Sequence, residues 1–202
     1  MEEKERILNL TEERIFRDGF YKTPMDEIAS ELRISKKTIY KFFPSKSDMV
    51  EAIVRRFMKK RQQDVLPILN SDKNAVEKFA GIVFLMTQNL SRISEKTFND
   101  LRVHFPSLWN EVEKFRTEMI NKNITKVVEQ GKREGLIADY PTPIIMTIFL
   151  SSIRSIVNPD FILNNNFSIK QATQITFQIL MSGILTEKGE KLFKKSISEI
   201  IQ

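Results

Sequence analysis

Residues 23–46 limit the possible folds of this chain more than any other stretch, because they predict two short helices joined by a tight bend. Met25, Ile28 and Leu32 recur at helical spacing and would form the buried face of the first helix. Thr23 stands just before a proline, whose fixed φ suits a helix start, so we expect the Thr23 hydroxyl to cap this helix. The stretch therefore predicts a small helical domain near the N-terminus.

The second helix of this stretch would carry a basic outer face. Ser35 is a suitable N-cap for it, and Ile39 and Phe43 lie four residues apart, so both point inward. The side chains left on the outside are those of Lys36, Lys37, Tyr40 and Lys41. Two lysines in a first turn oppose the helix dipole at a cost of about 0.3–1 kcal/mol each, so their presence makes sense if an anion lies there.

Charge is distributed unevenly along the chain. The formal net charge is +6, yet residues 1–32 carry five Lys or Arg and nine Asp or Glu, whereas residues 33–61 carry ten and two. The positive charge therefore surrounds the basic helix, as expected for a protein that binds a polyanion such as nucleic acid. Ordinary solvated helix surfaces also carry such basic runs, so charge alone leaves both interpretations open.

Composition predicts an all-α fold. Only 6 Gly and 7 Pro occur in 202 residues, 41% of which are hydrophobic, a balance that suits long helices with short connections and a sizeable core. Gly19 and Gly135 are suited to the left-handed position that ends a helix. Outside residues 23–46 we expect helices at about 2–18, 46–63, 74–89, 94–103, 107–134, 142–157 and 169–185.

Several classes of function are disfavoured by what the chain lacks. It has no Cys and a single His, so thiol chemistry and Cys- or His-based metal sites are not expected, and no Gly-rich phosphate loop follows a strand. We therefore expect no enzyme activity, no metal and no cofactor. No run of eighteen apolar residues occurs, and the N-terminus is acidic and amphipathic, so we expect a cytoplasmic protein without a membrane partner.

Two C-terminal segments, 142–157 and 169–185, are apolar on nearly all sides. A chain this short offers too few partners to cover both, so we expect a symmetric homodimer in which a second copy covers them. The residues predicted for the dimer interface are Ile148, Ser152, Arg154, Ile156, Phe177, Met181 and Ile184.

Over nearly all of residues 5–57 the chain resembles the DNA-binding domain of the TetR/AcrR family of bacterial transcription regulators. The residues that carry the resemblance are Ile7-Leu8, Gly19-Phe20, Thr23, Ile28-Ala29, Leu32, Ile34-Ser35, Thr38-Ile39-Tyr40, Phe42-Phe43 and Ser45-Lys46. The chain departs from the pattern at Arg33, which stands where the family commonly has a Gly. The bend must therefore form without the residue best suited to positive φ.

The resemblance implies an N-terminal three-helix, homeodomain-like helix-turn-helix domain and a C-terminal helical domain for ligand binding and dimerisation. We expect the first over residues 1–46, a connecting helix over 47–66 and the second over 67–202. Contact with a double-stranded DNA operator is expected from Thr23, Lys36, Lys37, Thr38, Tyr40, Lys41, Phe42 and Lys46. In a two-fold dimer the reading helices would lie one helical turn of DNA apart, roughly 34–36 Å.

The family's C-terminal domain also encloses an inducer pocket, and aromatic and apolar side chains are candidates to line it. The candidates are Phe79, Val83, Phe84, Phe98, Leu101, His104, Phe105, Trp109, Met119, Met146 and Phe149. As a group they suggest a bulky apolar or amphipathic effector, although ordinary core packing is an alternative for each of them. His104 is either a polar ligand contact or a hydrogen-bonded, partly buried histidine.

These patterns predict a ligand-responsive transcription regulator, in this family most often a repressor. It would bind a near-palindromic operator as a homodimer and be released by an unidentified small molecule. The competing interpretation is a helical ligand-binding or adaptor protein whose DNA-binding head is degenerate.

Overall fold

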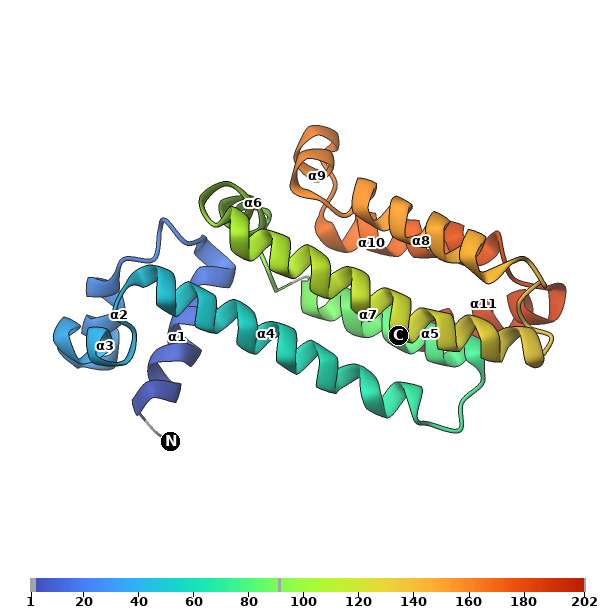
Figure 1. Ribbon diagram of the computed structural model, residues 1–202, viewed down its shortest axis with the longest axis horizontal. Coiled ribbons are helices and arrows are strands. Elements are labelled where there is room, and N and C mark those ends of the chain that lie inside the picture. The colour runs from blue at the N-terminus through green and yellow to red at the C-terminus, as the bar shows by residue number, and fades with distance from the viewer. Residues whose placement is uncertain (1–2, 91, 202) are drawn as a thin grey trace. The chain divides into compact units, whose positions relative to one another are not determined.

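The structure of the chain is a computed structural model that describes residues 3–90 and 92–201. Within these ranges it contains eleven α-helices and no strand, which confirms the all-α prediction (Figure 1). The helices are α1 (Glu3–Asp18), α2 (Met25–Leu32), α3 (Lys36–Phe42), α4 (Lys46–Leu69), α5 (Ala75–Leu90), α6 (Glu95–His104), α7 (Pro106–Arg133), α8 (Thr142–Ile156), α9 (Pro159–Asn165), α10 (Ile169–Ser182) and α11 (Glu187–Ile201). Residue 2, the predicted start of the first helix, lies outside the described residues.

The chain forms two compact units, and each is discontinuous in sequence. Unit 1 combines the described residues of 1–61 with 92–112, and unit 2 combines those of 62–91 with 113–202. Our sequence-based division at residues 46 and 66 assumed continuous domains. Instead, α6 and the start of α7, which fall inside the predicted C-terminal domain, belong to the unit that holds α1 to α3.

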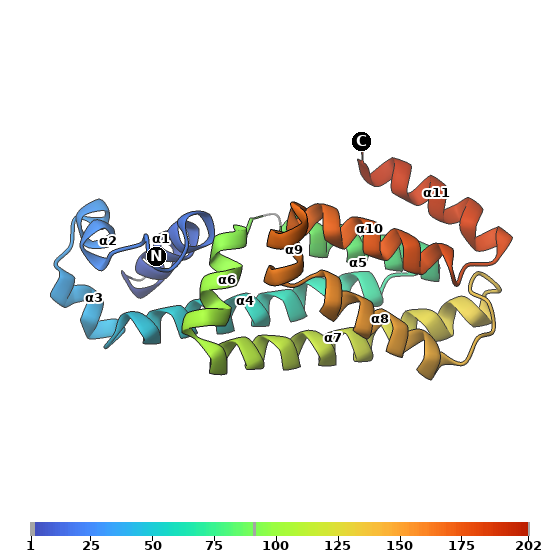
Figure 2. The ribbon, with the colours of Figure 1, turned by 90° about the horizontal axis from the view of Figure 1, so that it is seen from above.

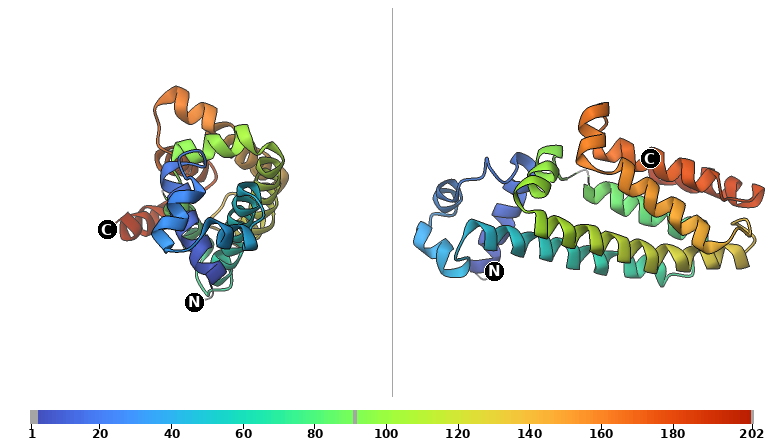
Figure 3. Two further views of the ribbon diagram at one scale, coloured as in Figure 1. Left: turned by 90° about the vertical axis from the view of Figure 1, so that its left-hand side faces the viewer. Right: turned by 45° about the horizontal axis from the view of Figure 1, so that its top comes forward.

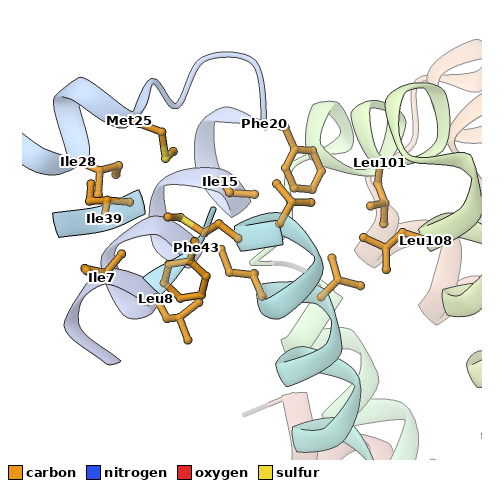
Figure 4. Close-up of a cluster of buried hydrophobic side chains, with 14 of the residues drawn as sticks. Ile7, Leu8, Ile15, Phe20, Met25, Ile28, Ile39, Phe43, Leu101 and Leu108 are labelled. Atoms are coloured by element: carbon orange, nitrogen blue, oxygen red, sulfur yellow. The ribbon is translucent and has the colours of Figure 1, made fainter. Parts of the chain in front are cut away.

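Unit 1 is built around one apolar cluster (Figure 4). Ile7 and Ile15 of α1, Ile39 of α3 and Ile53 of α4 have no exposed surface, so all of these helices point their apolar faces at the same centre. Leu101 of α6 closes one side of the cluster. Each such side chain stabilises the fold by about 1.5–3 kcal/mol relative to an exposed position, so α6 is part of this core and not an appendage.

The turn between α1 and α2 differs from the prediction. Thr23 does not cap α2, because the N-cap is Pro24 and the buried Thr23 hydroxyl donates to the carbonyl oxygen of Gly19 at 2.8 Å. Gly19 has a φ of +89°, and a Cβ there would lie 2.7 Å from Oδ2 of Asp100. That carboxylate accepts a hydrogen bond from the backbone N–H of Phe20 at 3.1 Å. The turn is therefore held by α6 as well as by its own residues.

The C-terminal end of α1 is satisfied by the same helix. The Thr97 hydroxyl donates to the carbonyl oxygen of Ile15 at 2.6 Å, and the backbone N–H of Ser94 donates to that of Phe16 at 2.8 Å. The last carbonyl groups of a helix have no partner within the helix, and buried ones are costly if left unpaired. Ser94 supplies the partner for the carbonyl group of Phe16, and Thr97 adds a second donor to that of Ile15, which also accepts the N–H of Gly19 at 2.9 Å.

Unit 2 packs α5 against α10 and α11, and α10 against α8 (Figure 2). Phe79 of α5, Phe149 of α8 and Phe177 of α10 meet edge to face, with ring centroids 5.7 to 6.3 Å apart. The short α9 lies where α8 ends and α10 begins (Figure 3). This buried aromatic cluster joins α5 to α8 and α10, which follow it by more than fifty residues in the sequence.

No single helix among the described residues combines the length and apolar character needed to cross a membrane. Within the ranges that the structure describes, α8 and α9 reach that length and composition only when taken together, and they are bent by 59° at the break between them.

The bend between α2 and α3 is a Schellman motif with an arginine in the left-handed position. Arg33 has φ 55° and ψ 43°, and its N–H donates to the carbonyl oxygen of Ser30 at 3.1 Å. The N–H of Ile34 donates to that of Ala29 at 3.0 Å. Both hydrogen bonds are those of the usual glycine version of this motif, so the absent glycine changes the energy of the bend and not its shape.

We expect Arg33→Gly to stabilise the protein by about 1 kcal/mol, because a left-handed conformation costs an L-residue roughly 1–2 kcal/mol and glycine avoids that cost. In a chain of this length that corresponds to a rise of about 2–4 °C in the melting temperature, measured by circular dichroism. Arg33→Ala is the control, because it removes the same charge and keeps the Cβ. An equal rise for both variants would assign the effect to charge and contradict the backbone argument.

Candidate nucleic-acid interface

Helix α3 is anchored on one side and presented on the other. Its N-cap is Ser35, whose hydroxyl accepts from the N–H of Thr38 at 3.0 Å, as predicted. Ile39 and Phe43 are buried in the unit 1 cluster and fix the inner face of the helix. Because α3 is only seven residues long, these anchors and the cap determine its orientation.

The outer face of α3 is basic and solvent-exposed. Lys37 and Lys41 lie one turn apart, and Tyr40, which is partly exposed, lies beside them. Lys36 forms an ion pair with Asp26 of α2, with Nζ 3.0 Å from Oδ2, and its hydrogen bond to that carboxylate raises the pKa of Lys36. Lys37 and Lys41 can contact a phosphate backbone directly. Lys36 can do so once its ion pair with Asp26 breaks.

Four other predicted contact residues are placed less favourably for DNA. Thr38 and Phe42 are half-buried, and the Thr38 hydroxyl lies 2.9 Å from that of Ser35 in the cap. Lys46 is the half-buried first residue of α4, where burial lowers the pKa of its ammonium group and the Asp100 carboxylate opposes that shift. Thr23 is buried, and its hydroxyl is already used within the chain.

The predicted ligand-pocket residues do not form one cluster, because some of them belong to unit 1. Phe98 packs edge to face on Trp109 with ring centroids 5.2 Å apart, and Phe105 packs on Phe20 at 5.3 Å. The exposed His104 ring lies 4.9 Å from that of Tyr21. Leu101 completes this group within the core that supports the helix-turn-helix.

The remaining pocket candidates lie in unit 2, where half of them are core residues. Phe79, Phe149 and Met146 are buried, Val83 is half-buried, and Phe84 is exposed. Among the predicted set, Met119 alone lines the cavity of about 190 Å³ that the described part of unit 2 contains between α4, α5 and α7.

This cavity is also lined by Lys78, which we did not predict as a site residue. Lys78 is buried, and the signal that could have revealed it is its position in the sequence. It falls at the second place of the stripe Ala75, Lys78, Phe79, Ile82, whose other members are apolar and spaced as one helix face. A lysine on the buried side of a helix is unusual enough to be a candidate.

The predicted dimer-interface residues also need correction. Phe177 and Met181 are fully buried inside unit 2, where a second chain cannot reach them. Arg154 is exposed and donates to the Thr117 hydroxyl at 2.8 Å. Ile148 is exposed, whereas Ser152, Ile156 and Ile184 are half-buried. The exposed isoleucines that the prediction missed are Ile144, Ile175 and Ile179.

Comparison with known proteins shows which family the N-terminal part of the chain resembles. The sequence model of the tetR family of bacterial regulatory proteins matches residues 7–53. The HTH-type transcriptional regulator YvaF of Bacillus subtilis (strain 168) is 24% identical over 186 residues, which cover 91% of this chain and 96% of the relative.

Two solved structures are similar over most of this chain. A transcriptional regulator from Saccharomonospora viridis in complex with choline has a TM-score of 0.69 at 20% identity, covering 91% of this chain and 98% of the other. One from Cytophaga hutchinsonii has a TM-score of 0.68 at 20% identity, covering 90% and 98%. The shared fold therefore extends well beyond the helix-turn-helix into the C-terminal helices.

We expect Ser35→Ala to destabilise the protein by about 0.5–2 kcal/mol, because the Thr38 N–H at the start of α3 would lose its side-chain acceptor. The melting temperature, followed by circular dichroism, should fall accordingly. Ser35→Gly is the matched control, since glycine at an N-cap costs only a few tenths of a kcal/mol. Equal losses for the two variants would mean that the cap does not stabilise α3.

Proposed function

Because this chain belongs to the TetR family of transcription regulators, we propose that it binds a near-palindromic DNA operator as a homodimer through α3. The observation that carries the proposal is the exposed basic face of α3, whose opposite side is anchored by the fully buried Ile39. A small-molecule effector that changes the spacing between the two α3 helices would lower the affinity for DNA. The protein would then act as a repressor in the cytoplasm, where bacterial DNA lies.

Lys37 and Lys41 are the proposed phosphate contacts, with Tyr40 beside them for the groove. Phosphate contacts fix the register of a protein on the duplex, whereas contacts to base edges give specificity. Lys36 would exchange Asp26 for a phosphate. Breaking this ion pair costs little free energy, because exposed ion pairs are weak. Thr38 and Phe42 remain proposed groove contacts, and Lys46 adds positive charge nearby. Thr23 is not among the proposed contacts, because its buried hydroxyl donates to the carbonyl oxygen of Gly19.

The proposed dimer interface is an isoleucine face on α8 and α10, two helices that pack side by side in unit 2 (Figure 2). Ile144 and Ile148 of α8 are 56% and 51% exposed, and Ile175 and Ile179 of α10 are 48% and 67% exposed. Each pair is spaced by four residues, so each forms one stripe along its helix. Burying a side chain of this kind stabilises an association by about 1.5–3 kcal/mol, and a second copy of the chain supplies the matching surface.

A small-molecule effector is supported by the related regulator from Saccharomonospora viridis, which was solved with choline bound. Unit 2 of this chain has a cavity of its own, of about 190 Å³. The competing function, a ligand-binding or adaptor protein with a degenerate DNA-binding head, retains that cavity and predicts no specific DNA binding. The two functions are therefore separated by a DNA-binding measurement.

We expect the protein to bind specifically to the DNA upstream of its own coding sequence, with an affinity that falls steeply as salt increases. In Lys37→Ala with Lys41→Ala, the slope of log K against log salt concentration should become shallower by about 2, which is about one for each lost phosphate contact. Fluorescence anisotropy with a labelled duplex at several salt concentrations measures this slope.

The control for this measurement is Lys114→Ala with Lys191→Ala, which removes the same charge from exposed positions in unit 2. It should leave the slope unchanged. Equal slopes for the wild type and the α3 variant would show that α3 is not the DNA-contacting helix. Absence of specific binding by the wild type to its upstream region would favour the adaptor function.

We expect Ile148→Glu with Ile179→Glu to convert the dimer to a monomer, because two carboxylates would have to be buried without partners in each half of the interface. Sedimentation equilibrium measures the mass. Val103→Glu is the control, since Val103 of α6 is 53% exposed and lies outside the isoleucine face. A double variant that keeps the dimer mass would place the interface elsewhere.

A further inference from the structure

The cavity of about 190 Å³ in unit 2 lies between the last part of α4, the start of α5 and the middle of α7. Its apolar lining includes Val65, Leu69, Met119 and Val127. Cavities that hold drug-sized ligands measure roughly 300–1,000 Å³, so this one suits a smaller molecule.

Lys78 places a buried positive charge in this lining. The side chain is only 8% exposed, and its ammonium group donates one hydrogen bond within the described residues, to Oε1 of Gln130 at 3.0 Å. An ammonium has three N–H donors, and a neutral amide supplies no counter-charge. A buried charge without a charged partner is costly, so the structure holds a cation in a place where an anion would stabilise it.

Gln130 is itself held in place, which fixes the direction of that single hydrogen bond. Its amide nitrogen donates to Oε1 of Glu134 at 2.6 Å and to the backbone carbonyl oxygen of Lys73 at 3.1 Å. The second carboxylate oxygen of Glu134 accepts from the N–H of Ala75 at 2.8 Å. The carboxylate of Glu134 therefore accepts hydrogen bonds from two amide groups, and Lys78 contacts only the neutral amide of Gln130.

The rest of the polar lining matches an anion as well. Lys122 and Lys126 lie one turn apart on α7 at the exposed mouth of the cavity, and the lining contains no Asp or Glu. Asn123, between them, is buried, and its amide nitrogen has the thioether sulfur of Met119 as its acceptor, at 3.7 Å. A thioether is a weak acceptor, so this amide can donate to a better one.

We propose that this cavity binds a small organic anion, in which a carboxylate or phosphate group pairs with Lys78 and a short apolar body packs on Val65, Leu69 and Val127. The inference rests on the proposed function in one respect, namely that the anion is the effector of a DNA-binding regulator. Lys122 and Lys126 attract the anion and contact it from the mouth of the cavity. A cation of the same size is rejected by the three ammonium groups.

The test is isothermal titration calorimetry on the full chain with four probes that share a six-carbon alkyl body: heptanoate, hexyl phosphate, hexanol and hexyltrimethylammonium. We expect the wild type to bind one or both anions and to bind hexanol and the cation at least about tenfold more weakly. The stronger of the two anions identifies the head group as carboxylate or phosphate. Failure of both anions to bind, or equal binding of the cation, overturns the proposal.

Lys78→Met tests the proposed counter-charge, because methionine fills similar space without the ammonium group. We expect at least about a tenfold loss of anion affinity, whereas Lys114→Met, on the same helix as the mouth lysines and outside the cavity, should bind as the wild type does. Unchanged affinity in a folded Lys78→Met overturns the proposal. If that variant is unfolded by circular dichroism, Lys122→Met with Lys126→Met decides, with a several-fold loss expected and unchanged affinity again overturning it.

A second readout separates this inference from the proposed function. Anion binding is measured by heat without DNA, and the effect of the same anion on operator binding is measured by fluorescence anisotropy. Anion binding that depends on Lys78 supports the site even if the protein binds no operator. Operator binding that ignores a bound anion contradicts its role as effector and leaves DNA recognition by α3 intact.

Discussion

The contact between α6 and the end of α1 is the constraint on which the proposed DNA-binding face depends. Asp100 accepts the N–H of Phe20, and the N–H of Ser94 donates to the carbonyl oxygen of Phe16, so groups left unpaired by the end of α1 and the following turn find partners about eighty residues away. The turn sets where α2 begins, and α2 leads through the left-handed Arg33 into α3. The position of the exposed lysines of α3 therefore depends on contacts made by α6.

The helix-turn-helix could be predicted from the sequence because its signals are local. Ser35 caps α3, Ser45 accepts the N–H of Asp48 at the start of α4, and the inward isoleucines follow helical spacing. Thr23 was wrongly predicted to cap α2, because its hydroxyl has a second possible hydrogen-bond partner nearby in the sequence. Its hydroxyl could reach either the start of α2 or the carbonyl group of Gly19, and the sequence does not show that the turn brings the second one closer.

The C-terminal predictions differ from the structure where the answer depended on packing between distant segments. Phe98 and Trp109 are as aromatic as Phe79, yet they pack on each other in unit 1, and no local pattern marks residues 92–112 as belonging there. For α10, the sequence predicted a helix that is apolar on nearly all sides and did not show which side is inside. Phe177 lies on the inner face and Ile179 on the outer one, only two residues apart.

The discontinuity of unit 1 has a consequence for synthesis of the chain. The ribosome makes α1 to α4 and then α5 before it makes residues 92–112, a stretch that completes the unit 1 core. At about 5–20 residues per second, the roughly fifty residues after position 61 take about 3–10 s. During that interval the newly made α1 to α4 have neither Leu101 to cover their apolar cluster nor Asp100 to accept the Phe20 N–H. Unit 1, which contains the part of the protein that is translated first, can therefore complete its core only after α5 of unit 2 has been made.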